Sequence, residues 1–259
     1  MLVGAWPLSD PMSLALRLTG VTALKIEIWF VGEKNIMTTL NRRAMRRREG
    51  LFDQIIGEAS VALQVLSGVS VASRPNPAGK ASVDEPETLK PGQQRHAAGL
   101  MRINHVGEIC AQALYRGQAV AVEREQTKDL LREAAREEVD HLVWCQQRLK
   151  ELNSRVSLLN PVWYAGSFAL GVVASRAGER YNLGFMAETE RQVEAHLNDH
   201  LKILPPEDER SRKIITQMRD DEIRHRRTAQ QNGGKDLPFP IPSFMKIMSK
   251  FMTKSVYYV

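Results

Sequence analysis

Two copies of one pattern, Glu-x-x-His, are the strongest chemical signal in this chain, and each follows a further glutamate by about thirty positions. Residues three apart on a helix lie on one face, so each copy can direct a carboxylate and an imidazole to the same side. Four helices with four carboxylates and two imidazoles are what a bundle uses to hold two metal ions in its core. The candidate metal ligands are Glu108, Glu138, His141, Glu190, Glu222 and His225.

The donor set also indicates which metal it would hold. A single Glu-x-x-His arises easily by chance on a polar helix, but two copies with matched upstream glutamates do not. Oxygen-rich ligation with one imidazole for each ion suits iron or manganese better than zinc or copper, which favour more nitrogen or sulfur. Open coordination positions on such ions would admit dioxygen. Cys145, one turn beyond His141, is expected to be a packed core thiol and not a ligand.

Two acidic residues beside the pattern are candidates for a supporting role. A metal-bound histidine usually donates its second N–H to a fixed acceptor. Asp221 and Glu137 each precede a ligand glutamate, and we expect a crossed pairing of Asp221 with His141 and of Glu137 with His225. The alternative is that both are surface acids.

Four helices are expected to position these ligands, and no stretch alternates as a β-strand would. Apolar residues at helical spacing predict helices over 93–125, 127–153, 178–204 and 206–232. Thr127 is a candidate N-cap of the second helix. Pro205-Pro206 is expected to end the third helix, and Gly233-Gly234 the fourth. The sequence therefore predicts an all-α four-helix bundle.

Two apolar segments accompany this bundle. The first, 157–175, lies between the second and third helices and carries no charge, with Trp163 and Tyr164 near its start. Three readings are open: a buried connecting helix, a helix lying partly in a membrane interface, or a membrane span. The second, 241–259, sets apolar side chains against lysines and is predicted to be a basic amphipathic helix. It belongs to a C-terminal segment, 235–259, that packs on the bundle or on a membrane.

Ahead of the bundle domain, residues 93–234, the chain divides into two parts. Residues 1–36 contain an apolar stretch interrupted by charges, which fits neither a membrane span nor a signal peptide. We expect them to be disordered, or to be upstream sequence included by a wrong start assignment. Residues 37–92 are predicted to form a short amphipathic helix at 50–68 and a linker containing proline and glycine at 73–92.

Composition narrows the class of protein. A hydrophobic share of 43% is enough for a sizeable core. The net charge of +6 gathers at both ends of the chain, which suggests an anionic surface. No zinc-finger or RNA-binding pattern accompanies the charge, so lipid is favoured over nucleic acid. Cys110 and Cys145 cannot build a disulfide framework, so a reducing, cytoplasmic setting is expected.

Several segments resemble the demethoxyubiquinone hydroxylases, a family of the ferritin-like di-iron superfamily. The first ligand helix of that family is matched by Arg102-Ile103-Asn104-His105-Val106-Gly107-Glu108, and its second by Glu137-Glu138-Val139-Asp140-His141-Leu142. The remaining matching segments are 113–118, 157–163, 187–196 and 219–225. The resemblance runs from about residue 97 to residue 259 and includes all six ligand positions in order.

This resemblance implies a ferritin-like bundle with two iron ions per subunit. By carry-over, Glu108 and His141 would hold one iron, Glu190 and His225 would hold the other, and Glu138 and Glu222 would bridge. Such enzymes are monooxygenases that insert one oxygen atom from dioxygen into the ring of a demethoxyubiquinone during ubiquinone biosynthesis. The polyprenyl quinone substrate implies a peripheral protein on the cytoplasmic face of the bacterial inner membrane, with a ubiquinone-synthesis complex as a further candidate partner and no nucleic acid.

His196 matches a histidine of the family that lies near the site and assists proton or electron movement. Leu197 stands where the family often has tyrosine, so the resemblance does not extend to a tyrosine-mediated electron route at this position. Tyr115 is the nearby substitute, although it is expected to be a core residue. No nicotinamide or flavin signature is present, so electrons must come from outside or from the reduced quinone. The competing functions are a soluble ferritin-like oxidase, an iron-storage protein, and a scaffold in which iron is only structural.

Overall fold

The computed structural model describes residues 51–81 and 89–259, without the side chains of residues 51, 52, 54 and 55. Residues 57–259 form one compact unit. The predictions for residues 1–36 lie outside the described part of the chain.

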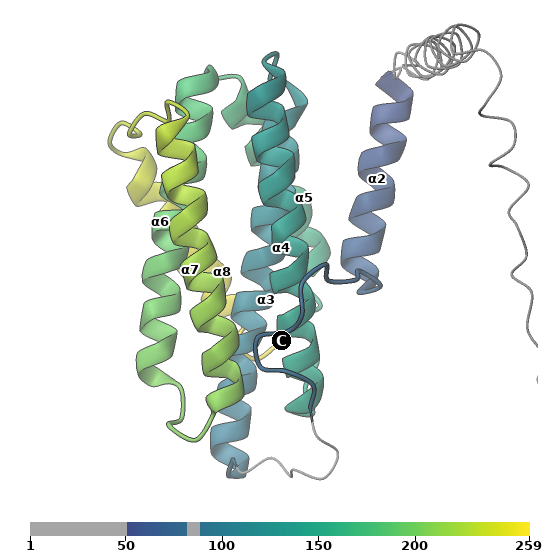
Figure 1. Ribbon diagram of the computed structural model, residues 1–259, viewed down its shortest axis with the longest axis vertical. Coiled ribbons are helices and arrows are strands. Elements are labelled where there is room, and N and C mark those ends of the chain that lie inside the picture. The colour runs from purple at the N-terminus through teal and green to yellow at the C-terminus, as the bar shows by residue number, and fades with distance from the viewer. Residues whose placement is uncertain (1–50, 82–88) are drawn as a thin grey trace, which may run out of the picture. The chain divides into compact units, whose positions relative to one another are not determined.

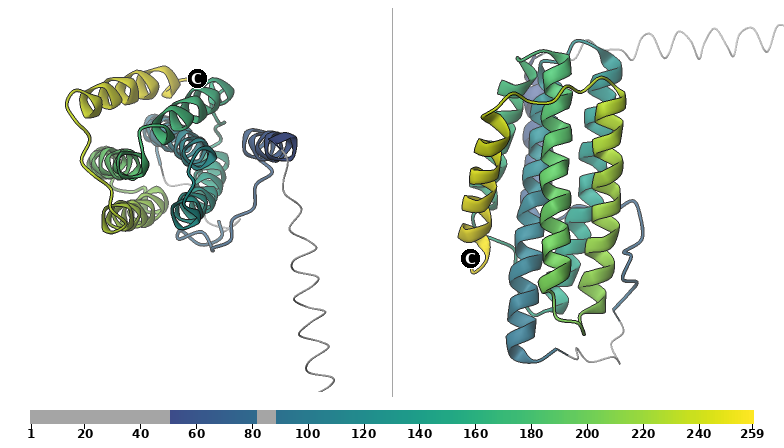
Figure 2. Two further views of the ribbon diagram at one scale, coloured as in Figure 1. Left: turned by 90° about the horizontal axis from the view of Figure 1, so that it is seen from above. Right: turned by 90° about the vertical axis from the view of Figure 1, so that its left-hand side faces the viewer.

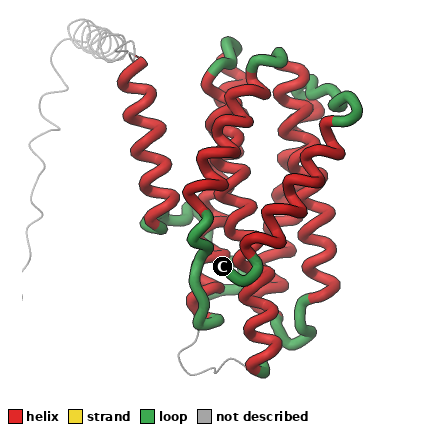
Figure 3. Tube along the Cα trace, turned by 180° about the vertical axis from the view of Figure 1, so that it is seen from behind, coloured by secondary structure: helices red, strands yellow, loops and turns green. Residues whose placement is uncertain are grey.

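The described residues are helical or irregular, and they contain no strand, as the tube trace shows (Figure 3). This confirms the prediction of an all-α protein. The helices are α2 Leu51–Ser67, α3 Pro91–Val120, α4 Glu125–Glu151, α5 Asn160–Ser175, α6 Glu179–Ile203, α7 Glu209–Gln231 and α8 Ile241–Val256. The four long helices α3, α4, α6 and α7 run side by side as the bundle that holds the candidate ligands (Figure 1).

The ends of the bundle helices follow from local chemistry. Helix α6 ends before Pro205, as predicted, because proline cannot continue a helix. Helix α7 begins after Asp208, whose carboxylate accepts a hydrogen bond of 2.9 Å from the backbone N–H of Ser211. It ends before Gly233, which has a φ of +96° that glycine adopts without strain. The prediction for Thr127 is wrong, because α4 begins earlier, at Glu125.

Helix α5 packs directly on α3 through two glycines. A Cβ atom added to Gly117 would lie 2.2 Å from the carbonyl oxygen of Phe168, and one added to Gly171 would lie 2.2 Å from that of Leu114. Only glycine allows the two backbones to approach this closely. The contact fixes the segment between α4 and α6 against the ligand helix α3.

Helices α5 and α8 present apolar side chains to solvent. Val162 and Val173 of α5 are each 67% exposed, and Ile247 and Phe251 of α8 are each 64% exposed. The two helices meet where the rings of Trp163 and Phe251 lie 6.1 Å apart, and α8 runs along the outside of the bundle (Figure 2). Among the described helices, none has both the length and the apolar character that a membrane crossing requires. The spanning interpretation of 157–175 is therefore wrong. The interpretation as a buried connecting helix holds only in part, because Tyr164 and Gly171 are buried whereas the two valines are exposed.

Residues 68–81, which we call the strap, follow α2 and carry no helix or strand. The expected linker begins within them, at Ser73. The lack of regular structure agrees with that expectation, but Ser73 is bound to the bundle: its backbone N–H donates to Asp140 of α4 at 2.6 Å. The prolines and glycines of this segment indicated irregular structure. They gave no information about the hydrogen bond between Ser73 and Asp140.

Candidate metal centre

The structure brings all six predicted ligands together between the four bundle helices. They form two groups in which one ligand atom from each residue lies within 4.8 Å of the others. The first group is Glu108, Glu138, His141 and Glu222, and the second is Glu138, Glu190, Glu222 and His225. Glu138 and Glu222 belong to both groups. We call these six residues the ligand cluster.

The ligand cluster lies between two apolar layers of the bundle. One layer includes Met101, Trp144 and Met218, which lie further toward one end of helices α3, α4 and α7. The other includes Leu131 and Met186, toward the opposite end. All six side chains are buried, and that of His141 is 0% exposed. Packing on both sides therefore keeps water away from four carboxylates.

Both histidines direct Nδ1 toward the carboxylates. Nδ1 of His141 lies 3.0 Å from Glu138, 3.2 Å from Glu222 and 3.4 Å from Glu108. Nδ1 of His225 lies 3.3 Å from both Glu138 and Glu222, and 3.6 Å from the third carboxylate of its group. The two imidazoles thus approach the shared carboxylates in the same way.

The second nitrogen of each histidine faces an outer acid, in the crossed arrangement that the sequence predicted. Nε2 of His141 lies 2.9 Å from Oδ2 of Asp221, and Nε2 of His225 lies 2.8 Å from Oε2 of Glu137. Each acid sits on the helix opposite its histidine. A proton on Nε2 would satisfy the outer acid and would leave the Nδ1 lone pair free for a cation.

Burial and mutual contact shift the pKa values within the ligand cluster in opposite directions. Burial raises the pKa of Glu108 and of Glu190 well above the ordinary carboxyl value. Burial acts in the same sense on Glu138, but hydrogen bonds from the two histidines outweigh it and hold its pKa well below that value. Burial acts to lower the pKa of both histidines. Hydrogen bonds to the surrounding acids, such as the one between His141 and Asp221, outweigh burial and raise both pKa values.

The ligand cluster fits a pair of cations. Oε1 of Glu138 and Oε1 of Glu222 are buried, and the histidine nitrogens that approach them, Nδ1 of His225 at 3.3 Å and Nδ1 of His141 at 3.2 Å, do not leave either oxygen with a well-formed hydrogen bond. With all four carboxylates ionised, two protonated imidazoles would leave a net negative charge in a dry site, and the raised pKa values of Glu108 and Glu190 reflect this excess of acid. Buried charge of this kind is normally compensated by a partner or a metal. The oxygen-rich donor set with one imidazole in each group suits iron or manganese.

Tyr115, which the sequence offered as a substitute for the family's tyrosine while predicting it to be a core residue, contacts the ligand cluster. It is buried among the apolar residues of α3, as expected of a core residue. Its hydroxyl also donates a short hydrogen bond to Oε1 of Glu190. Burial and the nearby Glu190 carboxylate raise the pKa of Tyr115 well above its ordinary value, so this phenol stays protonated. The sequence signal for this contact was the position of Tyr115 two turns from Glu108 on the same helix.

His196, predicted to assist proton or electron movement, lies on α6 two turns beyond Glu190. Its ring packs against that of His200, with the centroids 3.9 Å apart. Burial lowers its pKa to about 4, and Nε2 is buried with no hydrogen-bond partner among the described residues. The structure does not include His196 in either ligand group. Its functional role stays a prediction.

Comparison with known proteins identifies the family. Residues 95–256 match the family model described as ubiquinone biosynthesis protein COQ7. The chain belongs to this family. It is similar to a protein of Bordetella avium named 3-demethoxyubiquinol 3-hydroxylase, at 62% identity over 83% of this chain and 98% of the relative.

Relatives of the same name occur in other bacteria. The protein of Bordetella pertussis is 57% identical over 86% of this chain and 99% of its own length. That of Ralstonia pickettii is 55% identical over 80% of this chain and 99% of its own length. The match to the COQ7 family covers all six residues of the ligand cluster, so the geometry and the relationship point to the same centre.

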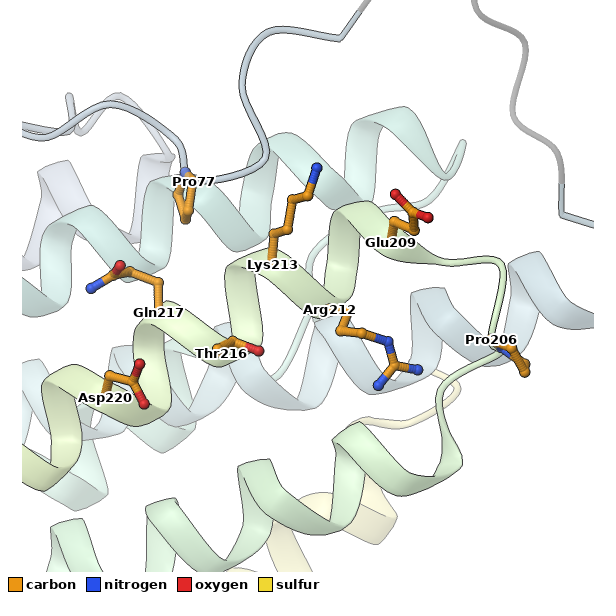
Figure 4. Close-up of a pocket in the computed structure, with 8 residues that line it drawn as sticks. All are labelled: Pro77, Pro206, Glu209, Arg212, Lys213, Thr216, Gln217 and Asp220. Atoms are coloured by element: carbon orange, nitrogen blue, oxygen red, sulfur yellow. The ribbon is translucent and has the colours of Figure 1, made fainter.

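A pocket on the outer side of α7 lies apart from this COQ7 ligand cluster (Figure 4). None of the six cluster residues lines it. Its lining residues are Pro77, Pro206, Glu209, Arg212, Lys213, Thr216, Gln217 and Asp220. They are mostly polar, and one of them, Pro77, comes from the strap. This pocket is a surface hollow, and none of the predicted ligands reaches it.

Proposed function

We propose that this chain is a monooxygenase that hydroxylates the ring of a demethoxyubiquinol with dioxygen, as a step of ubiquinone biosynthesis. One observation carries the proposal: six buried ligand residues converge within a chain that is 57% identical to a 3-demethoxyubiquinol 3-hydroxylase over 99% of that relative. The name of the relatives supports an enzyme and specifies a quinol ring as the substrate class.

The proposal includes two iron ions in each subunit. Glu108 and His141 would hold the first, Glu190 and His225 would hold the second, and the two carboxylates common to both ligand groups would bridge them. When bound, the iron pair supplies dioxygen activation for insertion of one oxygen atom into the ring. This assignment rests on the donor chemistry and on the family.

The remaining work falls to residues of the chain. Asp221 and Glu137 hold the Nε2 protons and so orient the imidazoles. The two apolar layers exclude water, which strengthens each electrostatic contact in the centre. Tyr115 donates to Glu190 and fixes the orientation of that carboxylate. His196, neutral at pH 7, is our candidate for carrying a proton between the centre and the surface of α6.

The lipid tail of the substrate leads us to propose a peripheral membrane protein, on the cytoplasmic face of the bacterial inner membrane. The exposed apolar face of α5 and α8 supports this, because Lys246, Lys250 and Lys254 of α8 accompany it and suit anionic headgroups. Flotation with anionic vesicles tests it. Phe251→Ser should reduce the bound fraction, and Leu63→Ser, which changes an equally exposed side chain on α2, should not. Equal binding of both variants would refute the assignment of this face.

Two other functions compete with this one. An iron-storage protein or an oxidase of a soluble substrate would use the same bundle and the same ligand cluster. The names of the relatives do not favour either. A scaffold role, with only structural iron, predicts that Glu138→Ala leaves quinone synthesis intact, whereas an enzyme would lose it.

Mass spectrometry of lipid extracts tests the proposed reaction. A strain that lacks this gene should accumulate a quinone precursor with one ring methoxy group fewer than ubiquinone. The wild-type gene should restore ubiquinone, and the Glu138→Ala variant should not. Normal ubiquinone in the deletion strain, or full rescue by Glu138→Ala, would refute the proposal.

A further inference from the structure

The strap, residues 68–81, is fastened to the two helices that carry Glu-x-x-His. At its centre, the backbone N–H and the hydroxyl of Ser73 both donate to the carboxylate of Asp140 on α4. Toward its far end, the guanidinium of Arg210 on α7 donates to the carbonyl oxygens of Ala78 and Gly79. In Figure 1 the strap is the dark blue loop that follows α2 and crosses α4. An irregular segment is thus tied across the outside of the centre.

Arg74 brings a strap side chain to the edge of the ligand cluster. Its Nε donates to Asp140 at 2.6 Å, and its Nη1 donates to Oδ2 of Asp221 at 2.8 Å. The same Oδ2 lies 2.9 Å from Nε2 of His141, and Nη2 of Arg74 lies 3.5 Å from that nitrogen. Cζ of Arg74 is 4.9 Å from the centre of the Trp144 ring, which in turn packs against the His141 ring. One guanidinium therefore fixes both the acid and the aromatic ring that border His141.

The outer acid of the other histidine is held by the bundle and not by the strap. Glu137, the outer acid of His225, accepts from Nη1 and Nη2 of Arg224 on α7, at 3.2 and 2.9 Å. None of the hydrogen bonds that the described residues give Glu137 comes from the strap. The Glu137 side chain is 23% exposed, whereas that of Asp221 is 5% exposed. The two halves of the centre therefore share ligand types and differ in how firmly the outer acid is held.

We infer that Arg74 is a positioning residue for the metal site at His141, and that the strap makes the two metal sites unequal. The guanidinium fork binds two carboxylates in fixed directions, which keeps Asp221 in the orientation that receives the Nε2 proton. Nδ1 of His141 is thereby directed at the ligand cluster. This inference rests on the proposed function, because it assumes that the ligand cluster binds two cations.

The size of the effect follows from the place of Arg74 in this chain of contacts. Loss of a residue that directly supports a metal ligand costs 10- to 100-fold in affinity. Arg74 acts one contact further out, through Asp221, and its side chain is 33% exposed. We therefore expect the low end, about a tenfold faster release of metal from one site.

The test uses the full-length, iron-loaded chain under anaerobic conditions and follows iron release to an excess of a chromogenic ferrous chelator. In Arg74→Gln, one ion should leave about tenfold faster, and the other should keep the wild-type rate. Arg74→Lys keeps the charge but cannot hold both acids as a fork, so its effect should be intermediate. Arg210→Gln is the matched control: it removes the same charge from α7, at the place where Arg210 binds the far end of the strap and also contacts Glu151. It should leave both release rates unchanged.

Three results would overturn the inference: wild-type release in Arg74→Gln, equal acceleration of both ions, or the same acceleration in Arg210→Gln. Circular dichroism melting of each variant shows whether it is folded. If Arg74→Gln does not fold, Arg74→Lys decides, and wild-type release in that variant counts against the inference. If the wild-type chain does not bind iron, the proposed function fails together with the inference. If the wild-type chain binds two ions and one of the three results above is found, only the inference fails.

Discussion

Replacement of Asp221 by asparagine changes one acid beside the metal centre without changing its shape. The carboxylate accepts from four donors. Oδ2 faces His141 and Arg74, at 2.9 and 2.8 Å, and Oδ1 faces Arg224 and Gln217, at 2.7 and 3.2 Å. An asparagine has one acceptor oxygen and one NH₂ group, so it must turn the NH₂ group toward one of these two pairs of donors. Either orientation breaks the arrangement.

The orientation that turns NH₂ toward His141 has the greater effect on metal binding. Nε2 would then have to accept a hydrogen bond, and the ring proton would move to Nδ1, the nitrogen that faces the carboxylates. The other orientation keeps the proton of His141 on Nε2, but it turns the NH₂ group toward Arg224, which is itself a donor. Loss of such a supporting partner costs 10- to 100-fold in metal affinity, which is about 1.4 to 2.8 kcal/mol. We expect Asp221→Asn to lower the affinity of one site by this amount.

Anaerobic titration of the metal-free chain with ferrous iron measures the effect. Wild type should bind both ions tightly, and Asp221→Asn should bind one as wild type does and the other 10- to 100-fold more weakly. Asp220→Asn is the control, because that neighbouring acid is 56% exposed and pairs with Arg219. Unchanged affinity in Asp221→Asn, or equal loss in both variants, would refute the reasoning.

Three further predictions concern stability. Tyr115→Phe leaves an oxygen of Glu190 without its donor and should lower the free energy of unfolding of the metal-free chain by about 1 to 3 kcal/mol in urea; no change would contradict the role of this bond. Gly171→Ala forces a Cβ into a carbonyl oxygen of α3 and should cost about 1 to 3 kcal/mol, whereas Gly166→Ala on the same helix meets no atom and should be neutral or slightly stabilising. Burial lowers the pKa of His200 to about 2, so it is neutral in the folded chain and takes up a proton on unfolding below its ordinary pKa of about 6.5. Stability should therefore fall with pH below 6.5, and between pH 7.5 and 5.5 wild type should lose about 1.4 kcal/mol more than His200→Gln; parallel losses would contradict the shift.

The bundle and its ligands could be predicted because their signals are local. Apolar spacing marked the four helices, and a three-residue separation placed Glu138 beside His141 without knowledge of the fold. The crossed pairing with the outer acids also followed, because Asp221 and Glu137 occupy equivalent positions beside the two ligand glutamates. Symmetry between the two halves of the chain carried this information.

The rest depends on contacts between distant segments, for which the sequence holds no period. Tyr115 meets Glu190 only because α3 and α6 pack in one particular register. Arg74 lies in a stretch whose prolines and glycines indicate a linker, and its partner Asp221 is 147 positions away. In the sequence, Gly171 is only a weak helix former, whereas in the structure it permits the close contact between α5 and α3. In each case the deciding neighbour is set by packing.

The most direct test of the central claim is an anomalous difference map, recorded at the iron edge, from crystals of the iron-loaded chain. The account predicts two peaks within the ligand cluster, one beside Nδ1 of His141 and one beside Nδ1 of His225, with Glu138 and Glu222 reaching both. A map with no peak in the ligand cluster, or with iron bound elsewhere on the chain, would contradict it.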